Sequence, residues 1–308
     1  MQKVAFIHEH PTWADALLRE FDEQGFAIEK INVAELAFET VSSRAPRFDF
    51  AINRINMMPS VERLPSVVFQ TLHYLHWLES CGVRVVNGAR AHFVGASKST
   101  QNGVFSSLGL HCPNAIAIYQ PEDALDAATK IGYPVIVKPN IGGSGTGVEK
   151  FDNAEELSLA VENKLLDLGI DRSGIVQEFV ESDGFVYRVE VLGEQLFYAT
   201  RQQIKSGSFN YCATEACAAP GSDEDVSDAF EIETFVPEQQ IIDDVVNIVR
   251  SSGDDLGGVE YFIDTRRGKR CYYDFNPYSN FVSNGETLLG FSPERRYVYF
   301  VRTLIEAA

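Results

Sequence analysis

The first ninety residues alternate between short apolar runs and amphipathic segments, which is the pattern of strands that alternate with helices. The apolar runs predict strands at 4–7, 26–28, 48–52 and 83–86, and the segments between them predict helices at 12–24 and 66–80. Because each strand is followed by a helix and then by the next strand, we expect a small parallel sheet with helices on its faces.

The remainder of the chain has a different pattern. Helices are expected at 97–108 and 121–131, followed by a strand at 134–138. Beyond this strand, the segments 185–201 and 259–276 alternate between apolar and polar positions, as half-buried antiparallel strands do. A further amphipathic helix begins at Pro237 and is closed by Gly253. The sequence therefore predicts an α/β domain over 1–92, followed by an α+β region over 93–308.

Charge and hydropathy exclude several classes of partner. Lys and Arg number 26 against 44 Asp and Glu, a formal net charge of -18, which disfavours nucleic acid but still allows a small anionic ligand. The longest uncharged apolar stretch, Val67–Leu78, has 12 residues and contains histidines, so it is too short to span a membrane.

Cysteine usage and the amino-terminal residues indicate the compartment. The five cysteines form no Cys-x-x-Cys pair and are odd in number, which favours reduced thiols over a structural metal site. The segment from Met1 enters a strand-like run directly, without the apolar core of a signal peptide. We therefore expect a cytoplasmic protein.

A glycine-rich loop follows the strand that ends at Lys138 and Pro139. Residues 142–147 contain four glycines in six positions, with Ser144 and Thr146 between them. Such backbone can approach an anion closely and donate several N–H groups. A strand-like segment at 148–151 follows the loop, whereas Walker and Rossmann loops lead directly into a helix. The loop is therefore either a flap over phosphates or a surface hairpin without a ligand, and Lys138 favours the flap.

Two acids are predicted to face each other across a later hairpin. If strands 259–263 and 271–276 pair symmetrically about Arg267, Glu260 lies opposite Asp274, and Asn276 shares their face. Two carboxylates ~4 Å apart repel by roughly 4 kcal/mol at an effective dielectric constant of 20. A Mg²⁺ ion would reverse that effect, since it prefers such oxygen ligands. The alternative is a solvated acidic face.

These motifs occur in the order found in ATP-grasp enzymes. The chain resembles that superfamily through Lys98, Lys138 with its glycine flap, the strand 176–180, and the hairpin that carries Glu260 and Asp274. It is most similar to the branch that contains ribosomal-protein glutamate ligase, glutathione synthetase and D-alanine–D-alanine ligase. The resemblance implies the ATP-grasp fold, with 1–92 as the pre-ATP-grasp domain and 93–308 as the ATP-grasp domain, whose lid subdomain covers about 113–180.

The resemblance also implies roles for individual residues. It assigns ATP phosphates to Lys98, Lys138 and the flap residues Gly143, Ser144, Gly145 and Thr146; adenine to Gln177, Glu178 and Val180; and Mg²⁺ to Glu260, Asp274 and Asn276. Lys205 begins a segment, 205–209, that is similar to the Lys-Glu-Gly-Asp-Phe stretch of the glutamate-ligase branch. Arg188 matches the arginine of that branch's Asp-Ile-Arg strand, and Arg201 lies near its arginine-rich hairpin.

The sequence departs from the family pattern at three places. Val186 stands where the ribose-binding Asp is expected, which leaves Asp183 and Glu181 as candidates. Glu260 replaces the usual Asp, and Asp274 replaces the usual Glu, as in a compensated exchange of side-chain lengths. The segment 276–280 replaces the Asn-Ser-Ser-Pro-Gly turn, so substrate specificity does not carry over, although Ser279 stays a candidate substrate contact.

The function implied by this resemblance is ATP-dependent joining of a carboxylate and an amine through an acylphosphate. Arg188 and Arg201 would stabilise that intermediate, although Arg188 could instead form a structural ion pair. Arg54, after a predicted strand, could hold a substrate carboxylate. The substrates would be small molecules or peptides, and an assembly of identical subunits stays open. The alternatives are a small-molecule phosphotransferase and a nucleotide-binding partner protein with little turnover.

Overall fold

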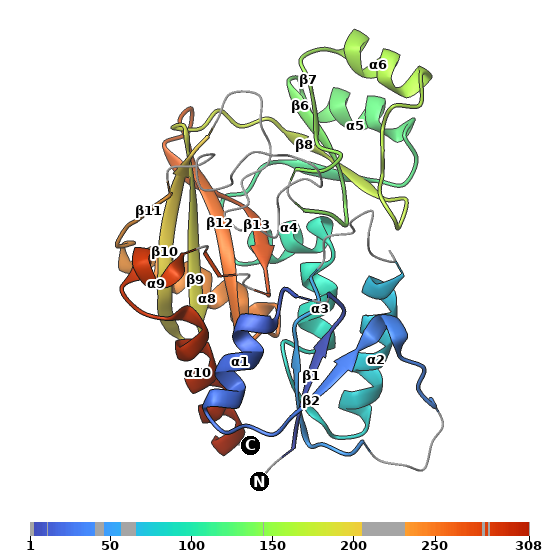
Figure 1. Cartoon of the computed structure of the whole chain (residues 1–308). Helices are drawn as coiled ribbons and strands as arrows, with labels where there is room; N and C mark the ends of the chain where they lie inside the picture. Colours follow the sequence, from blue (N-terminus) through green and yellow to red (C-terminus); the bar gives the residue numbers. More distant parts are fainter. Residues whose placement is uncertain are drawn as a thin grey trace.

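The strands of this chain form three sheets, each with its own helices. The computed structural model describes residues 3–10, 12–40, 46–56, 66–143, 145–204, 232–278, 281–282 and 284–307. In this part of the chain, a four-stranded parallel sheet is followed by a four-stranded and a five-stranded antiparallel sheet (Figure 1). The expected order, α/β and then α+β, is confirmed.

The first sheet is parallel, with strand order β2-β1-β3-β4. Its elements are β1 (Val4–His8), α1 (Asp15–Glu23), β2 (Ile28–Asn32), the 3₁₀ helix η1 (Val33–Glu35), β3 (Phe50–Asn53), α2 (Val67–Ser80) and β4 (Arg84–Val86). The expected strand at 26–28 begins later, at Ile28, because Phe26 turns into the core beside Phe21. Helices α3 (Ala89–Gly95) and α4 (Lys98–Ser107) lead out of this sheet. The expected domain boundary at 92/93 falls within α3.

The second sheet has strand order β5-β8-β6-β7 and lies at the upper right in Figure 1. Its elements are β5 (Ala115–Ile118), α5 (Asp123–Ile131), β6 (Val135–Pro139), β7 (Glu149–Phe151), α6 (Ala154–Glu162) and β8 (Gly174–Glu178). Asn153 caps α6, since its Oδ1 accepts a hydrogen bond of 3.0 Å from the Glu156 amide. The glycine loop joins two adjacent antiparallel strands, β6 and β7, as expected.

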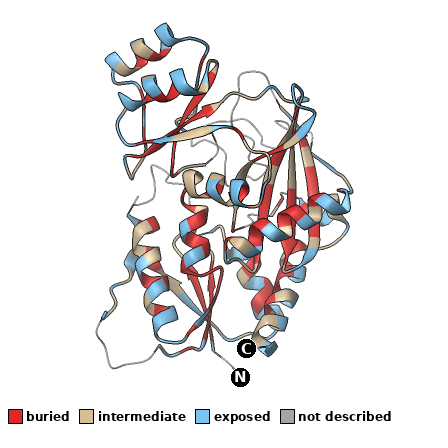
Figure 2. Ribbon diagram, turned by 180° about the vertical axis from the view of Figure 1, so that it is seen from behind, coloured by how far each residue is buried: buried red, intermediate tan, exposed pale blue. Residues whose placement is uncertain are grey.

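The third sheet, with order β11-β10-β9-β12-β13, carries most of the candidate site. Its elements are β9 (Phe185–Leu192), β10 (Gln195–Gln203), β11 (Ile232–Thr234), α8 (Gln239–Ser251), β12 (Leu256–Asp264), β13 (Lys269–Asn276), α9 (Gly285–Leu289) and α10 (Pro293–Ala307). Helices α4 and α8 cover one face, where Phe105 and Val245 pack against Val189 and Val259. Figure 2 shows these strands as largely buried.

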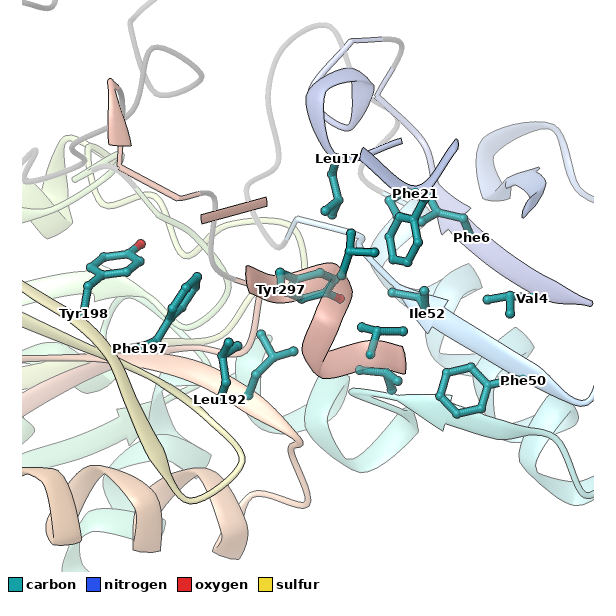
Figure 3. Close-up of a cluster of buried hydrophobic side chains, with 14 of the residues drawn as sticks. Val4, Phe6, Leu17, Phe21, Phe50, Ile52, Leu192, Phe197, Tyr198 and Tyr297 are labelled. Atoms are coloured by element: carbon teal, nitrogen blue, oxygen red, sulfur yellow. The ribbon is translucent and has the colours of Figure 1, made fainter. Parts of the chain in front are cut away.

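The first and third sheets share a hydrophobic core. Tyr297 of α10 lies between Phe197 of β10 on one side and Phe21 and Ile52 on the other (Figure 3). This packing fixes the position of the parallel sheet relative to the antiparallel one. None of the helices among the described residues combines the length and apolar character needed to cross a bilayer. Three cysteines in the described ranges, Cys81, Cys112 and Cys271, are free thiols.

A buried polar network also joins these two parts of the molecule. The Tyr278 hydroxyl, in the segment after β13, accepts a hydrogen bond of 2.5 Å from Asn53 Nδ2 at the end of β3. It also lies 3.3 Å from His92 Nδ1, and His92 Nε2 lies 2.8 Å from the Val68 carbonyl oxygen. Because that oxygen can only accept, Nε2 carries the proton in neutral His92. Burial lowers the pKa of His92 to about 4.

This network predicts acid sensitivity. The folded protein keeps His92 neutral, whereas the unfolded chain protonates it near the ordinary histidine pKa of 6.5. The contribution of neutral His92 to the free energy of unfolding is therefore present above pH 6.5 and is lost as the pH falls towards 4. At pH 4.5 the loss is about 2–3 kcal/mol. Urea unfolding at pH 7 and 4.5 measures this loss, which His92→Gln should reduce and His76→Gln, at an exposed position of α2, should not. An equal loss in wild type and His92→Gln would contradict the assignment.

Candidate active site

Two lysines from different parts of the chain meet the acidic hairpin. Lys98 is the first residue of α4, and its ammonium group forms an ion pair with Asp274 of β13. Lys138 is buried near the end of β6, an inner strand of the second sheet, where the charges of Lys98, Glu260 and Asp274 all act on it. The Lys98 amide also donates to the Asn140 carbonyl oxygen, 3.1 Å away, just beyond β6. The two lysines are thus held together by the junction of α4 with the second sheet.

Glu260 lies opposite Asp274, as the sequence predicts, but a β-bulge is needed to place it there. From Asp264↔Lys269 to Tyr261↔Tyr272, the pairing would continue by placing Tyr273 opposite Glu260. The register shifts at this point, so that Glu260 pairs with Asp274. Tyr273 is the extra residue, and its hydroxyl donates a hydrogen bond of 2.6 Å to Glu260 Oε2. The bulge therefore brings Tyr273 and Asp274 to the same carboxylate.

Arg188 and Glu190 on β9 extend this polar face. Arg188 pairs with Glu260 in the register, and Glu190 pairs with Gly258, which itself pairs with Asn276 on the far side. Since paired residues share a face, Glu190 and Asn276 lie on either side of the Gly258 position. Arg188 Nε donates to Glu190 Oε1 at 2.7 Å, and Arg188 Nη1 donates to Glu260 Oε1 at 3.3 Å.

Burial and charge shift the ionisation of these groups in different directions. Burial, strengthened by the charge of Lys98, lowers the pKa of Lys138 to about 7. Burial and the charge of Asp274 raise the pKa of Glu260. The Lys98 ammonium lowers the pKa of Asp274 against the effect of burial. Asp274 is therefore the more readily ionised of the two acids. Burial opposes the charge of Arg188, but Glu190 and Glu260 outweigh it and raise the pKa of Arg188.

The hairpin residues fit a magnesium ion. They supply two carboxylates and, from Asn276, an amide oxygen that accepts a hydrogen bond of 2.9 Å from the Tyr278 amide. A carbonyl oxygen has a second lone pair for a metal. Within the described ranges, no three His, Cys, Asp or Glu side chains gather closely enough to hold an ion by themselves. This set suits Mg²⁺, which commonly binds one or two carboxylates together with substrate phosphates.

The flap residues lie directly after the buried end of β6. Gly145 and Gly147 have φ values of 72° and 69°, and the Thr146 amide donates to the Gly143 carbonyl oxygen at 3.1 Å. A Cβ at Gly147 would lie 2.9 Å from Pro139 Cγ, so this position requires glycine for both its backbone conformation and its packing. Ser144 lies outside the described residues. Gly147 therefore packs against Pro139, the residue that follows Lys138.

The candidate adenine residues lie at the end of β8. Gln177 is buried, and its Oε1 has no hydrogen-bond partner among the described residues. The Glu178 carboxylate is occupied, because Arg267 Nη2 donates to it at 2.6 Å and Asn114 Nδ2 at 3.0 Å. Val180 is half-buried just beyond the strand, and the exposed Asp183 accepts a hydrogen bond of 2.7 Å from the Tyr187 hydroxyl. Of these side chains, buried Gln177 Oε1 is an acceptor that a ligand could engage.

Arg201 and Arg188 lie on opposite faces of the third sheet, and Arg54 packs over aromatic rings. Arg201 pairs with Tyr187 in the register, which places it on the opposite face from Arg188, and it forms an ion pair of 2.8 Å with Glu233. The guanidinium of Arg54 lies over the rings of Phe281 and Tyr297, 5.4 and 5.5 Å from their centroids. Strand alternation accounts for the position of Arg201, and packing against Tyr297 of α10 accounts for the position of Arg54. Lys205 and Ser279 lie outside the described residues.

Two polar residues of the cluster, Glu190 and Tyr273, are not among the residues that the sequence motifs single out. The signal that relates to Glu190 lies in another strand, where Gly257 and Gly258 precede an apolar run. Glycine within a strand marks a place where another group approaches the backbone closely, and here that group is the Glu190 side chain. Tyr273 carries no such signal. It reaches Glu260 because of the bulge, which depends on how the two strands and their turn pack.

Known proteins are similar to this chain in sequence over part of its length. Residues 104–242 match the family model described as D-ala D-ala ligase C-terminus. Glutamate–LysW ligase ArgX of Sulfurisphaera tokodaii is 27% identical over 183 residues, which are 58% of this chain and 60% of that protein. The chain spans less than two thirds of the length of the curated relatives that it matches.

Solved structures extend the likeness to nearly the whole chain. The VanG D-Ala:D-Ser ligase of Enterococcus faecalis superimposes with a TM-score of 0.71 at 17% identity, covering 97% of this chain and 98% of that one. A RimK domain protein ATP-grasp from Sphaerobacter thermophilus gives a TM-score of 0.67 at 18% identity, with the same coverage of 97% and 98%. The chain therefore has the ATP-grasp fold, and the resemblance predicted from its motifs is confirmed.

Proposed function

We propose that this protein is an ATP-dependent ligase that joins a carboxylate to an amine and releases ADP and phosphate. The observation that carries the proposal is the convergence of Lys98, Lys138 and Arg188 on the acids Glu260 and Asp274, in a chain with the ATP-grasp fold. Cations placed beside paired oxygen ligands suit a metal-bound triphosphate. The names of several relatives, which are ligases of amino acids, support the same reaction class.

The chain's own residues would act chiefly by position and charge. Lys98 and Lys138 would neutralise phosphate oxygens, while the flap at 142–147 would donate backbone N–H groups to them. Glu260, Asp274 and Asn276 would hold Mg²⁺, which offsets phosphate charge when bound. The substrate carboxylate would attack the γ-phosphate, and the amine would then displace phosphate from the acylphosphate. Arg188 would stabilise the negative charge that develops at the acyl group.

The assignments of adenine to Gln177, Glu178 and Val180, and of ribose to Asp183, are part of this proposal. Glu178 would contribute through its backbone, since its carboxylate already binds Arg267. We leave Arg201 out, because strand alternation turns it away from Arg188.

We also propose the division into domains at 1–92 and 93–308. A cytoplasmic location fits the free thiols of Cys81, Cys112 and Cys271.

Oxygen-isotope transfer tests the reaction. The protein is incubated with Mg²⁺, ATP and pools of ¹⁸O-labelled amino acids or short peptides, with and without added amines. A ligase transfers one ¹⁸O atom to the released phosphate and forms an amide only when both substrates are present. A stable phosphorylated product without any amine would instead identify a phosphotransferase. Absence of ADP formation with every pool would indicate a nucleotide-binding partner protein.

A further inference from the structure

Glu190 is a buried acid with one of its oxygens unused. The residue is 0% exposed, and its Oε1 accepts the hydrogen bond of 2.7 Å from Arg188 Nε. Its Oε2 is also buried and has no hydrogen-bond partner in the described part of the chain. An unsatisfied buried polar atom costs about 1–3 kcal/mol, and more when the group is charged. Packing alone gives no reason to retain an acid here.

The neighbouring strand leaves room for this carboxylate. A Cβ added at Gly258 would lie 2.4 Å from Glu190 Oε1 and 2.7 Å from Oε2, closer than real contacts allow. Any other residue at 258 would therefore displace the carboxylate from its place between β9 and β12. The chain thus combines an acid at 190 with a glycine at 258, and together they put a negative charge beside Arg188.

Arg188 is shared between two carboxylates that differ in their other partners. Glu260 binds Arg188 at 3.3 Å, receives the Tyr273 hydroxyl at 2.6 Å, and is a candidate metal ligand. Glu190 binds Arg188 at the shorter distance of 2.7 Å, and its second oxygen meets no donor among the described residues. If Glu260 turns towards a metal, Glu190 is the anion that stays with the half-buried guanidinium of Arg188.

We propose that Glu190 is the positioning residue of Arg188. It holds Nε, so that Nη1 can leave Glu260 and turn towards substrate without the cation losing its anionic partner. The idea rests on the proposed function, in which Glu260 binds Mg²⁺ and Arg188 faces the acyl group. The unused Oε2 fits this role, because a guanidinium presents adjacent N–H groups as a fork that can bind both oxygens of one carboxylate. The role proposed for Arg188 at the acyl group therefore depends on Glu190, which keeps the guanidinium in place.

A binding experiment tests the proposal without knowledge of the substrates. Mn²⁺ serves as the probe, and its affinity is measured by electron paramagnetic resonance in the presence of saturating ADP. In Glu190→Gln, Glu260 becomes the anionic partner of Arg188. Because Glu260 must then leave Arg188 before it can bind the metal, metal binding is weakened. The Mn²⁺ affinity should fall about tenfold, the order expected for one charge-assisted hydrogen bond. Glu194 is exposed in the turn after β9 and pairs with Arg250 of α8, so it provides the control Glu194→Gln, whose Mn²⁺ affinity should stay unchanged.

A second background separates positioning from direct metal binding. In Arg188→Met, Glu190 has no guanidinium to hold, so adding Glu190→Gln should change the Mn²⁺ affinity by about threefold or less. Gly258→Ala displaces the carboxylate without removing its charge, and it should reproduce the loss seen in Glu190→Gln. Thermal unfolding of each variant establishes that the protein is folded, and Gly258→Ala supplies the answer if Glu190→Gln does not fold.

Three results would overturn the proposal. Unchanged Mn²⁺ affinity in both Glu190→Gln and Gly258→Ala would show that the carboxylate positions nothing. A tenfold loss that persists in the Arg188→Met background would make Glu190 a direct partner of the metal. Absence of ADP-dependent Mn²⁺ binding in the wild type would remove the proposed nucleotide site as well, whereas the first two results leave that site intact.

Discussion

Replacement of Asp274 by Asn is expected to lower Mg²⁺-dependent ATP turnover roughly a hundredfold to a thousandfold, the range found when one preorganised electrostatic group is lost. The amide keeps the shape of the side chain but removes the more readily ionised acid of the hairpin. It also removes the ion pair that holds Lys98 in the structure. Metal-free nucleotide binding should therefore persist or improve, because the released ammonium group can bind phosphate.

The rate of ADP release from ATP in the presence of Mg²⁺ measures the first effect, and calorimetric titration with ADP, with and without Mg²⁺, measures the second. The matched control is Asp126→Asn, which breaks an exposed ion pair of 2.6 Å with Lys130 on α5 and should change neither quantity. A variant at 274 that binds ADP more weakly without metal, yet keeps its Mg²⁺ dependence, would contradict the assignment. That result would mean that Asp274 orders Lys98 rather than holding the metal.

ADP affinity is expected to fall as the pH rises above about 7, because burial lowers the pKa of Lys138 to about 7. Below that pH the free protein carries a charged Lys138, and above it the side chain is mostly neutral. Bound phosphate favours the charged form, so binding above pH 7 must take up a proton at Lys138. The affinity should then fall by up to about tenfold for each pH unit.

Lys138→Met isolates this effect. It should weaken ADP binding by at least about tenfold at pH 6.5 and remove most of the pH dependence. Titration calorimetry in two buffers with different ionisation enthalpies measures the proton uptake directly. Lys130→Met, at an exposed position on α5, provides the control and should retain the wild-type profile. If Lys138→Met shows the same proton uptake as wild type, another group titrates and the assignment to Lys138 is wrong.

Local patterns were sufficient for most of the secondary structure. The helices predicted at 66–80 and 97–108 are observed at Val67–Ser80 and Lys98–Ser107. Periodicity and capping residues act within a few residues of one another, so a single sequence contains them. The expected helix at 12–24 is shorter, Asp15–Glu23, and its N-cap is Ala14 without a side-chain hydrogen bond.

The pairing of Glu260 with Asp274 is as predicted, but the reason for it differs from the symmetric turn that the sequence indicates. A turn centred on Arg267 predicts Glu260 opposite Asp274. The turn pairs Asp264 with Lys269, which taken alone would move Glu260 opposite Tyr273, and the bulge restores the predicted pair. A bulge changes register by one residue and so reverses the face of every later side chain. Its position depends on how the sheet packs, which a local pattern does not report.

By itself, the sequence determined the strands and helices, the order of the ATP-grasp motifs, and the residue types able to bind phosphate and Mg²⁺. Only the tertiary structure decided which of them meet: it joined Lys98 to Asp274, placed Glu190 beside Arg188, and turned Arg201 to the opposite face. The physical reason is that secondary structure follows from interactions between near neighbours along the chain. A charged cluster requires strands from distant segments to align in register, and that alignment is set by the packing of whole sheets.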